Sequence, residues 1–144
     1  MIILDTNVLS ALMLMDRDIA VVSWLDRQAA DSVWTTSITV FEIRFGLGLL
    51  PSGKRRSGLE GAFSRTLSED LEGRVLSFEE EAVRHAADLA ARRRSVGRPI
   101  DFRDVEIAGI VASKRAMLAT GNTRDFEGLG LKLANPWKDD ESQQ

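Results

Sequence analysis

The sequence contains no cysteine and only one histidine, His85. Without cysteine there are no disulfides, thiolate metal sites or cysteine nucleophiles. One histidine is too few for a zinc site built from nitrogen and sulfur ligands within a single chain. His85 also lies in a segment with ordinary helical spacing, which argues against a Ser-His-Asp triad. A metal ion bound by this chain would therefore have oxygen ligands, which favours Mg²⁺ or Mn²⁺.

Long apolar runs are missing as well. No run approaches the roughly 20 residues that span a bilayer. The opening segment MIILDTNVLSALMLMD has an acid at position 5 and no basic start, unlike a signal peptide, so we expect a cytoplasmic protein. The 144 residues, 44% hydrophobic and 28% charged, suit one globular domain. The net charge of −3 leaves a nucleic-acid partner open, because basic surfaces are local.

Short apolar segments alternate along the chain with segments of helical spacing, which predicts an α/β fold with a mostly parallel sheet. We expect one domain over residues 1–137 and a polar, disordered tail over 138–144. Asp16 or Asp18 is expected to cap the second helix, and Gly97 to end the fifth. Strands are expected at 1–4, 32–35, 74–78, 117–120 and 131–134, and helices near 8–13, 19–25, 38–50, 59–71, 79–94 and 101–115.

Asp5 directly follows the apolar segment 2–4. In open parallel sheets, ligands bind at the carboxyl ends of the strands, so the Asp5 side chain is expected to emerge at that edge. An equally good interpretation is that Asp5 caps the following helix, because aspartate is a favoured N-cap. Its position alone leaves both interpretations open.

Glu42 shares one predicted helical face with apolar residues. We expect this face to point toward the core, which would make the glutamate a carboxylate inside an apolar stripe. The other interpretation is a capping box, because Thr39 and Glu42 fit the S/T-x-x-E pattern. That box does not explain why apolar residues continue around the glutamate, at Ile38, Phe45, Gly46 and Leu49.

Asp104 repeats the pattern, because Ile107, Ala108 and Val111 follow it at +3, +4 and +7. Asp101 is the better cap for this helix, which frees Asp104 from that role. A buried carboxylate is unfavourable unless it is paired or coordinates a cation. Two acids on core-facing helices and one at a strand end therefore suggest three carboxylates that converge on a cation.

Three polar residues lie at or just beyond the end of the 117–120 strand: Thr120, Asn122 and Asp125. Asn122 is a candidate for positioning a water or a phosphate. Asp125 is a candidate for a fourth acidic group. Ordinary turn chemistry is the simpler explanation of each residue alone.

Four segments together resemble VapC-type PIN-domain toxins, and within them the FitB-like branch: MIILDTNVLS, TTSITVFEIRFGLGLLPSGKRR, GRPIDFRDVEIAGIVA and LATGNTRDFEGLGLKLANPW. They cover nearly the whole chain in the family order. The resemblance implies a prokaryotic, cytoplasmic endoribonuclease with a doubly wound α/β/α sandwich. It also implies a Mg²⁺ cofactor, with Mn²⁺ supporting activity.

The family's acidic cluster corresponds to Asp5, Glu42 and Asp104 of this chain. Thr6 corresponds to a hydroxyl residue that orients a carboxylate or a water. The fourth position of the family falls in the 122–125 stretch, where Asn122 and Asp125 compete. Gly121 stands where the FitB-like branch usually has arginine, so this chain lacks a phosphate-facing cation there.

Under this interpretation Asp5 and Asp104 bind one Mg²⁺, and Glu42 completes its shell or holds its waters. The metal would activate a water that hydrolyses the phosphodiester bond. A second metal could be recruited with RNA through Asn122 or Asp125. Three neighbouring carboxylates repel one another, so at least one should have a raised pKa in the metal-free protein.

The resemblance also implies a VapB-like antitoxin that inhibits the enzyme, a homodimer or a larger complex with antitoxin, and operator DNA bound only through the antitoxin. Arg44, Lys54 and Arg55 are candidates for contacting RNA or antitoxin. A solvated corner is the simpler explanation for the basic segment 54–56. Four large aromatic residues are expected to lie mostly in the core, with some at an interface: Trp24, Trp34, Phe41 and Phe45.

Two other classes of function compete. The first is a catalytically weak PIN-fold subunit of a DNA-binding regulatory complex, which Gly121 favours. The second is a doubly wound nucleotide-binding or phospho-acceptor module. Against the second, the chain has no G-x-G-x-x-G or G-x-x-x-x-G-K-[ST] loop and no acidic pair beside Asp5.

Overall fold

The computed structural model describes residues 1–14 and 17–138. These residues form a five-stranded sheet with the strand order β3-β2-β1-β4-β5, and every neighbouring pair is parallel. The strands are β1 (Ile2–Leu4), β2 (Val33–Thr36), β3 (Val75–Leu76), β4 (Met117–Ala119) and β5 (Lys132–Ala134). The helices are α1 (Thr6–Met13), α2 (Ile19–Asp26), α3 (Ser37–Gly48), α4 (Lys54–Arg65), α5 (Glu80–Ser95), α6 (Phe102–Lys114) and α7 (Thr123–Phe126).

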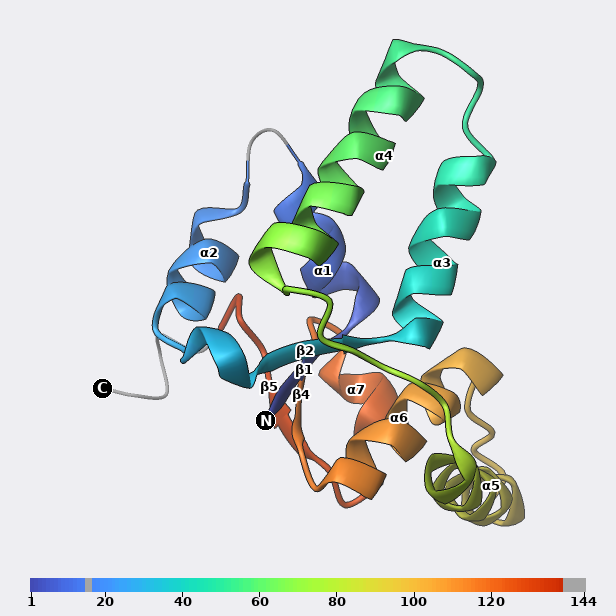
Figure 1. The fold of residues 1–144 in the computed structure, drawn as a ribbon. Coiled ribbons are helices and arrows are strands. Elements are labelled where there is room, and N and C mark those ends of the chain that lie inside the picture. Colours follow the sequence, from blue (N-terminus) through green and yellow to red (C-terminus); the bar gives the residue numbers. More distant parts are fainter. Residues whose placement is uncertain (15–16, 139–144) are drawn as a thin grey trace.

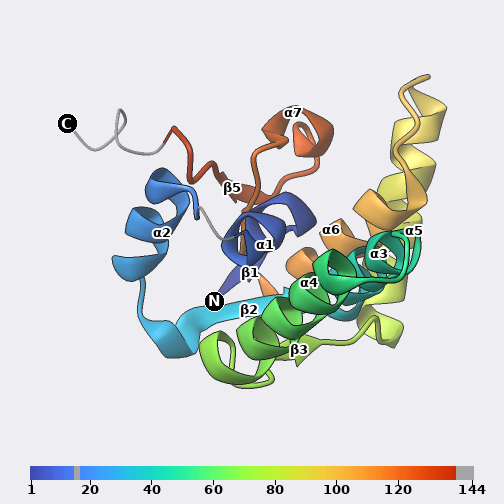
Figure 2. The ribbon, with the colours of Figure 1, turned by 90° about the horizontal axis from the view of Figure 1, so that it is seen from above.

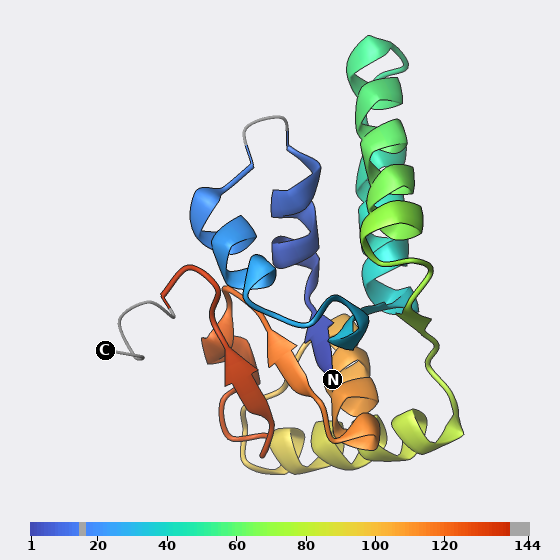
Figure 3. The ribbon, with the colours of Figure 1, turned by 60° about the vertical axis from the view of Figure 1, so that its left-hand side comes forward.

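Helices cover both faces of the sheet (Figures 1 and 3). Successive residues of a strand point to opposite faces, and β1 shows this directly. Leu4 packs in the core beneath α1, α2, α3 and α4, whereas Ile3 packs in the core formed with α5 and α6. The predicted doubly wound α/β/α fold is therefore confirmed.

The strand order reverses direction at β1. The chain first adds β2 and β3 on one side of β1, then crosses through α5 and α6 to add β4 and β5 on the other. Figure 2 looks down on this arrangement, with α1 over the middle of the sheet. In such folds ligands bind at the carboxyl ends of the strands where the order reverses. Asp5 follows β1 at this point.

Local signals in the sequence account for most helix ends. The Asp18 side chain caps α2 by accepting from the Ala20 N–H at 3.0 Å, whereas Asp16 lies outside the described residues. Gly97, with φ of +71°, follows α5. The Arg98 N–H donates to the Arg93 carbonyl at 2.9 Å, a bond typical of a glycine-terminated helix. The tail prediction falls on residues outside those described, apart from Lys138.

The sequence suggested that the basic segment 54–56 is a corner ahead of a helix, but the segment is itself helical. Lys54, Arg55 and Arg56 are the first turn of α4, which begins directly after Gly53. Basic residues in a first helical turn oppose the helix dipole, which is why the sequence pattern placed the helix start later. Arg56 offsets part of this by pairing with Glu60 at 2.6 Å.

No helix within residues 1–14 and 17–138 is long and apolar enough to cross a membrane.

Candidate active site

Three carboxylates come from three different elements: Asp5 from the end of β1, Glu42 from α3, and Asp104 from the first turn of α6. They form one electrostatic cluster, because the charge of Asp5 raises the pKa of both Glu42 and Asp104. Burial is the largest cause of the raised pKa of each acid, and repulsion from Asp5 adds to it at Glu42 and Asp104. That the three acids converge on one cation stays a prediction.

Asp5 fulfils both interpretations that the sequence left open. It caps α1, since its Oδ1 accepts from the Thr6 N–H at 2.8 Å. Its Oδ2 faces the neighbouring strand end and accepts from the Thr120 hydroxyl at 2.7 Å. Strand register explains this contact: Leu4 pairs with Ala119, so the next residues of the two strands lie side by side. Burial raises the pKa of Asp5, while the bonds from Thr120 and Thr6 oppose this.

Glu42 is not part of a capping box. The N-cap of α3 is Thr36, whose hydroxyl accepts from the Thr39 N–H at 3.1 Å. Glu42 Oε1 instead lies 3.3 Å from the Thr6 hydroxyl, which agrees with the orienting role that the resemblance implied for Thr6. Burial raises the pKa of Glu42, and the nearby charge of Arg103 lowers it.

The predicted orientation of α3 is wrong. The core-facing side carries Thr39, Ile43 and Leu47, all buried. On the side that continues from Glu42, Phe45 is 53% exposed and Leu49 is 71% exposed. The apolar residues around Glu42 thus form an open surface next to the site, and α3 uses its other side to pack on α1 and α4. The argument from a buried charge therefore holds in full only for Asp5, because Glu42 and Asp104 are both half-buried.

Asp104 is the least satisfied carboxylate of the cluster. Asp101 caps α6 by accepting from the Arg103 N–H at 2.9 Å, as predicted. Ile107, next on the same face as Asp104, is fully buried. No hydrogen bond or ion pair from the described residues reaches the Asp104 carboxyl. Burial, followed by the charges of neighbouring acids with Asp5 first, raises its pKa to about 6.

This raised pKa predicts how the metal-free protein responds to pH. The folded state holds the Asp104 proton more tightly than the unfolded chain, whose carboxyl has an ordinary pKa of 3.8. Stability from this group is thus fully present below about pH 4 and is lost as pH rises through about 6. Because the carboxyl is half-exposed, water screens the effect to about 1 kcal/mol.

The measurement is urea unfolding in EDTA at about pH 4 and about pH 7.5. Asp104→Asn should raise the free energy of unfolding at the higher pH and leave it nearly unchanged at the lower. An equal effect of the substitution at both pH values would show that Asp104 does not titrate as described.

The strand-end residues divide into an inner and an outer group. Thr120 is fully buried; its hydroxyl donates to Asp5 and accepts from the Asn122 N–H at 3.0 Å. The side chains of Asn122 and Asp125 are exposed. Asp125 is close enough for its charge to raise the pKa of both Asp5 and Asp104. Its role as a fourth acidic group stays a prediction, as does a role for Asn122.

The basic candidates lie apart from the carboxylates. The Arg44 guanidinium packs over the Phe63 ring, 5.2 Å from its centroid. Lys54 and Arg55 are exposed at the start of α4, at the far end of the α3–α4 hairpin from β2 (Figures 1 and 3). The cation that the sequence reasoning missed is Arg103. The signal that could have found it is its place one residue before Asp104.

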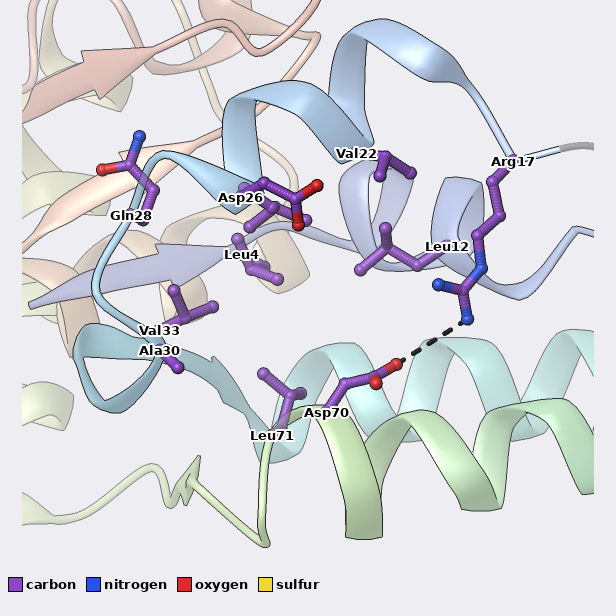
Figure 4. Close-up of a pocket in the computed structure, with 11 residues that line it drawn as sticks. Leu4, Leu12, Arg17, Val22, Asp26, Gln28, Ala30, Val33, Asp70 and Leu71 are labelled. Carbon is purple, nitrogen blue, oxygen red and sulfur yellow. Dashed lines mark ion pairs between the residues drawn. The ribbon is translucent and has the colours of Figure 1, made fainter.

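One cavity lies away from the carboxylates. It has a volume of about 290 Å³ and lies between α1, α2, β2 and the end of the α4 segment (Figure 4). Leu12 and Leu71 form part of its wall, and Arg17 pairs with Asp70 at 3.9 Å beside it. None of the candidate site residues lines it.

The residues fit a hard divalent cation by chemistry, since the cluster offers only oxygen donors. Asp104 adds a half-buried carboxyl that has no partner in the described part of the chain. Among the described residues, no three acidic or histidine side chains are already gathered closely enough to hold a metal ion. The donor set is thus present but is not a preassembled metal cage.

Comparisons with known proteins agree with this fold. Residues 2–130 match the PIN domain family. The chain is 41% identical over 138 residues to VapC ribonuclease Y4jK of Sinorhizobium fredii, covering 96% of this chain and 99% of that protein. It is 32% identical over 139 residues to toxin FitB of Neisseria gonorrhoeae, covering 96% and 100%.

Solved structures show the same relationship. FitAcB from Neisseria gonorrhoeae superposes with a TM-score of 0.82 at 31% identity, over 96% of this chain and 99% of that one. FitAB bound to an IR36 DNA fragment gives a TM-score of 0.85 at 31% identity, over 95% and 96%. The chain belongs to the PIN-domain family, in the group that includes the VapC ribonucleases and the FitB toxin.

Proposed function

We propose that this protein is a metal-dependent endoribonuclease and the toxin of a toxin–antitoxin pair. The observation that carries the proposal is Asp104, a carboxyl with no partner within residues 1–14 and 17–138 and a pKa raised to about 6, beside Asp5 and Glu42. A half-buried acid in this state is best satisfied by a cation. The relatives named as a VapC ribonuclease and as a tRNA(fMet)-specific endonuclease VapC support RNA as the substrate.

Asp5, Asp104 and Glu42 would hold a Mg²⁺ or Mn²⁺ ion. When bound, such an ion supplies charge neutralisation at the scissile phosphate and a more acidic water. The chain keeps these ligands in place: Thr120 and the Thr6 N–H fix both oxygens of Asp5, and the Thr6 hydroxyl contacts Glu42. Hydrogen bonds that orient metal-binding carboxylates are an established way to tune such sites.

An antitoxin partner follows from the solved relatives, which include FitAB bound to a DNA fragment. On this chain, the exposed apolar surface of α3 beside Glu42 suits an apolar segment of such a partner. Phe41 and Phe45 stack there with ring centroids 6.0 Å apart, and both are more than half-exposed. Of the four large aromatic residues, which were expected mostly in the core with some at an interface, Trp24 is buried and Trp34 packs partly buried against the core, whereas this pair is exposed. DNA binding would come through the antitoxin.

The test is RNA cleavage by the purified chain with Mg²⁺ or Mn²⁺, after EDTA treatment, and after the metal is restored. Cleavage should require the metal and return with it. The alternative function, a PIN-fold subunit without catalytic activity, predicts no cleavage with any metal. Cleavage that persists in EDTA would contradict both.

A further inference from the structure

A shallow pocket of about 300 Å³ lies beside the carboxylates, on the opposite side of Asn7 from Asp5. Asn7 is shared by the two sites. Its Nδ2 lies 3.4 Å from both Asp5 Oδ2 and the Thr120 hydroxyl, whereas its Oδ1 accepts from the Gly121 N–H at 2.9 Å. The pocket is lined by Asn7, Gly121, Asn122, Asn135, Trp137 and Lys138.

Trp137 forms the aromatic wall of this pocket and is held in place from several sides. Its indole N–H donates to Asp18 Oδ2 at 2.7 Å, and its backbone N–H donates to Asn135 Oδ1 at 3.0 Å. The residue is nevertheless 36% exposed. A tryptophan held by one hydrogen bond from its ring and one from its backbone, and still open to solvent, is available for stacking at little loss of conformational freedom.

Gly121 is what allows the ring to lie there. A Cβ atom at this position would come within 2.8 and 3.1 Å of two carbons of the Trp137 ring. The sequence reasoning took Gly121 as the loss of a phosphate-facing cation. In the structure the space next to Gly121 is filled by an aromatic wall instead, and Lys138 supplies a cation at the same pocket.

The chemistry of the lining differs from that of the neighbouring cluster. It contains three amide side chains, an aromatic ring and a lysine, and no carboxylate. A divalent cation would find no charged ligand there. A planar base would find a ring to stack on and amides that both donate and accept hydrogen bonds, which is how proteins recognise unpaired RNA bases.

We propose that this pocket binds an unpaired nucleobase of the RNA, next to the scissile phosphate that a metal ion at Asp5 and Asp104 would hold. The inference rests on the proposed function, because it takes RNA as the substrate of the adjoining site. It assigns Trp137 a stacking role and Gly121 a positioning role, since Gly121 acts only through the ring.

The test is the affinity of a short, labelled single-stranded RNA, measured by fluorescence anisotropy in the Asp104→Asn background, in which the RNA should stay intact. Trp137→Leu should weaken binding about tenfold, and Trp137→Phe by clearly less, because stacking survives in phenylalanine. Gly121→Ala should also weaken binding by displacing the ring. Val96→Ala, at an exposed apolar residue that ends α5 and lies outside the pocket, is the control and should bind as the Asp104→Asn parent does.

RNAs that lack one base at a chosen position identify the base that enters the pocket. Removal of that base should reduce the affinity of the Asp104→Asn parent for the RNA. It should cause no further loss of affinity once Trp137 is also replaced by leucine. Three results would each overturn the inference. The Trp137→Leu variant could bind RNA as tightly as the parent, it could lose affinity at the same abasic position as the parent, or the parent could fail to bind RNA. Thermal melting checks folding, and Trp137→Phe keeps the test valid if the leucine variant unfolds. Failure of the wild-type chain to cleave RNA, with base-dependent binding intact, would reject the proposed function and not the pocket.

Discussion

Replacing Asp5 or Asp104 by asparagine is expected to reduce RNA cleavage by at least about 100-fold. Removing residues that only orient metal ligands already costs about 10–100-fold in activity or metal affinity, so removing a ligand should cost more. Asparagine keeps the shape of the side chain and remains a good helix cap. The Asp5→Asn variant should therefore still begin α1 normally, and the loss of activity should come from the lost negative charge.

The measurement is the initial rate of cleavage of a labelled RNA at saturating Mg²⁺, with circular dichroism to confirm the fold. Asp88→Asn is the matched control, because Asp88 is exposed on α5 and lies outside the cluster. It should cleave at the wild-type rate. Wild-type cleavage by Asp104→Asn would remove Asp104 from the site.

Gly109→Ala is expected to destabilise the fold by about 2 kcal/mol, although alanine favours helices over glycine by about 1 kcal/mol. Gly109 lies in α6 where this helix crosses α5 most closely. A Cβ atom there would meet the Ala82 carbonyl oxygen and would lie 2.7 Å from Ala86 Cβ and 2.9 Å from Ala86 N. Two of these three atoms belong to the backbone of α5, so the helices must move apart to make room.

The matched control is Gly58→Ala in α4, where no atom lies within 4 Å of the added Cβ. There the helix preference acts alone, so stability should rise by up to about 1 kcal/mol. Urea unfolding of both variants measures the difference. If Gly109→Ala were as stable as Gly58→Ala, the α5–α6 packing would be looser than described. Because α6 carries Asp104, this close crossing also bears on the position of the site.

The alternation of apolar and amphipathic segments was sufficient to predict the order of the five strands and of the helices up to α6, but not α7 between β4 and β5. The carboxyl-end rule for parallel strands was sufficient to place Asp5 and Thr120 at the ends of their strands, and the structure brings the two together. These predictions succeed because they depend on local periodicity and on a general property of parallel sheets. Asp104 was placed correctly for the same reason, since Ile107, Ala108 and Val111 do face the core.

The predictions fail where tertiary contacts decide which side of an element is buried. Periodicity shows that α3 has apolar residues on more than one side, but it cannot tell which side other helices cover. The side with Phe45 and Leu49 was expected to face the core and is exposed. Trp137 and Gly121 are 16 residues apart in the chain, and nothing local indicates that the ring lies on the glycine. The effect of the Arg103 charge on Glu42 was not predicted, because the two residues lie on different helices and only the fold brings them near each other.

Binding of Mn²⁺ to the metal-free protein, measured by calorimetry, tests the central claim most directly. The claim is that Asp5, Glu42 and Asp104 together hold the ion. The wild-type chain and Asp88→Asn should bind Mn²⁺ with the same affinity, and Asp104→Asn should lose at least about tenfold. Undiminished binding by Asp104→Asn, or no binding by the wild-type chain, would contradict the account.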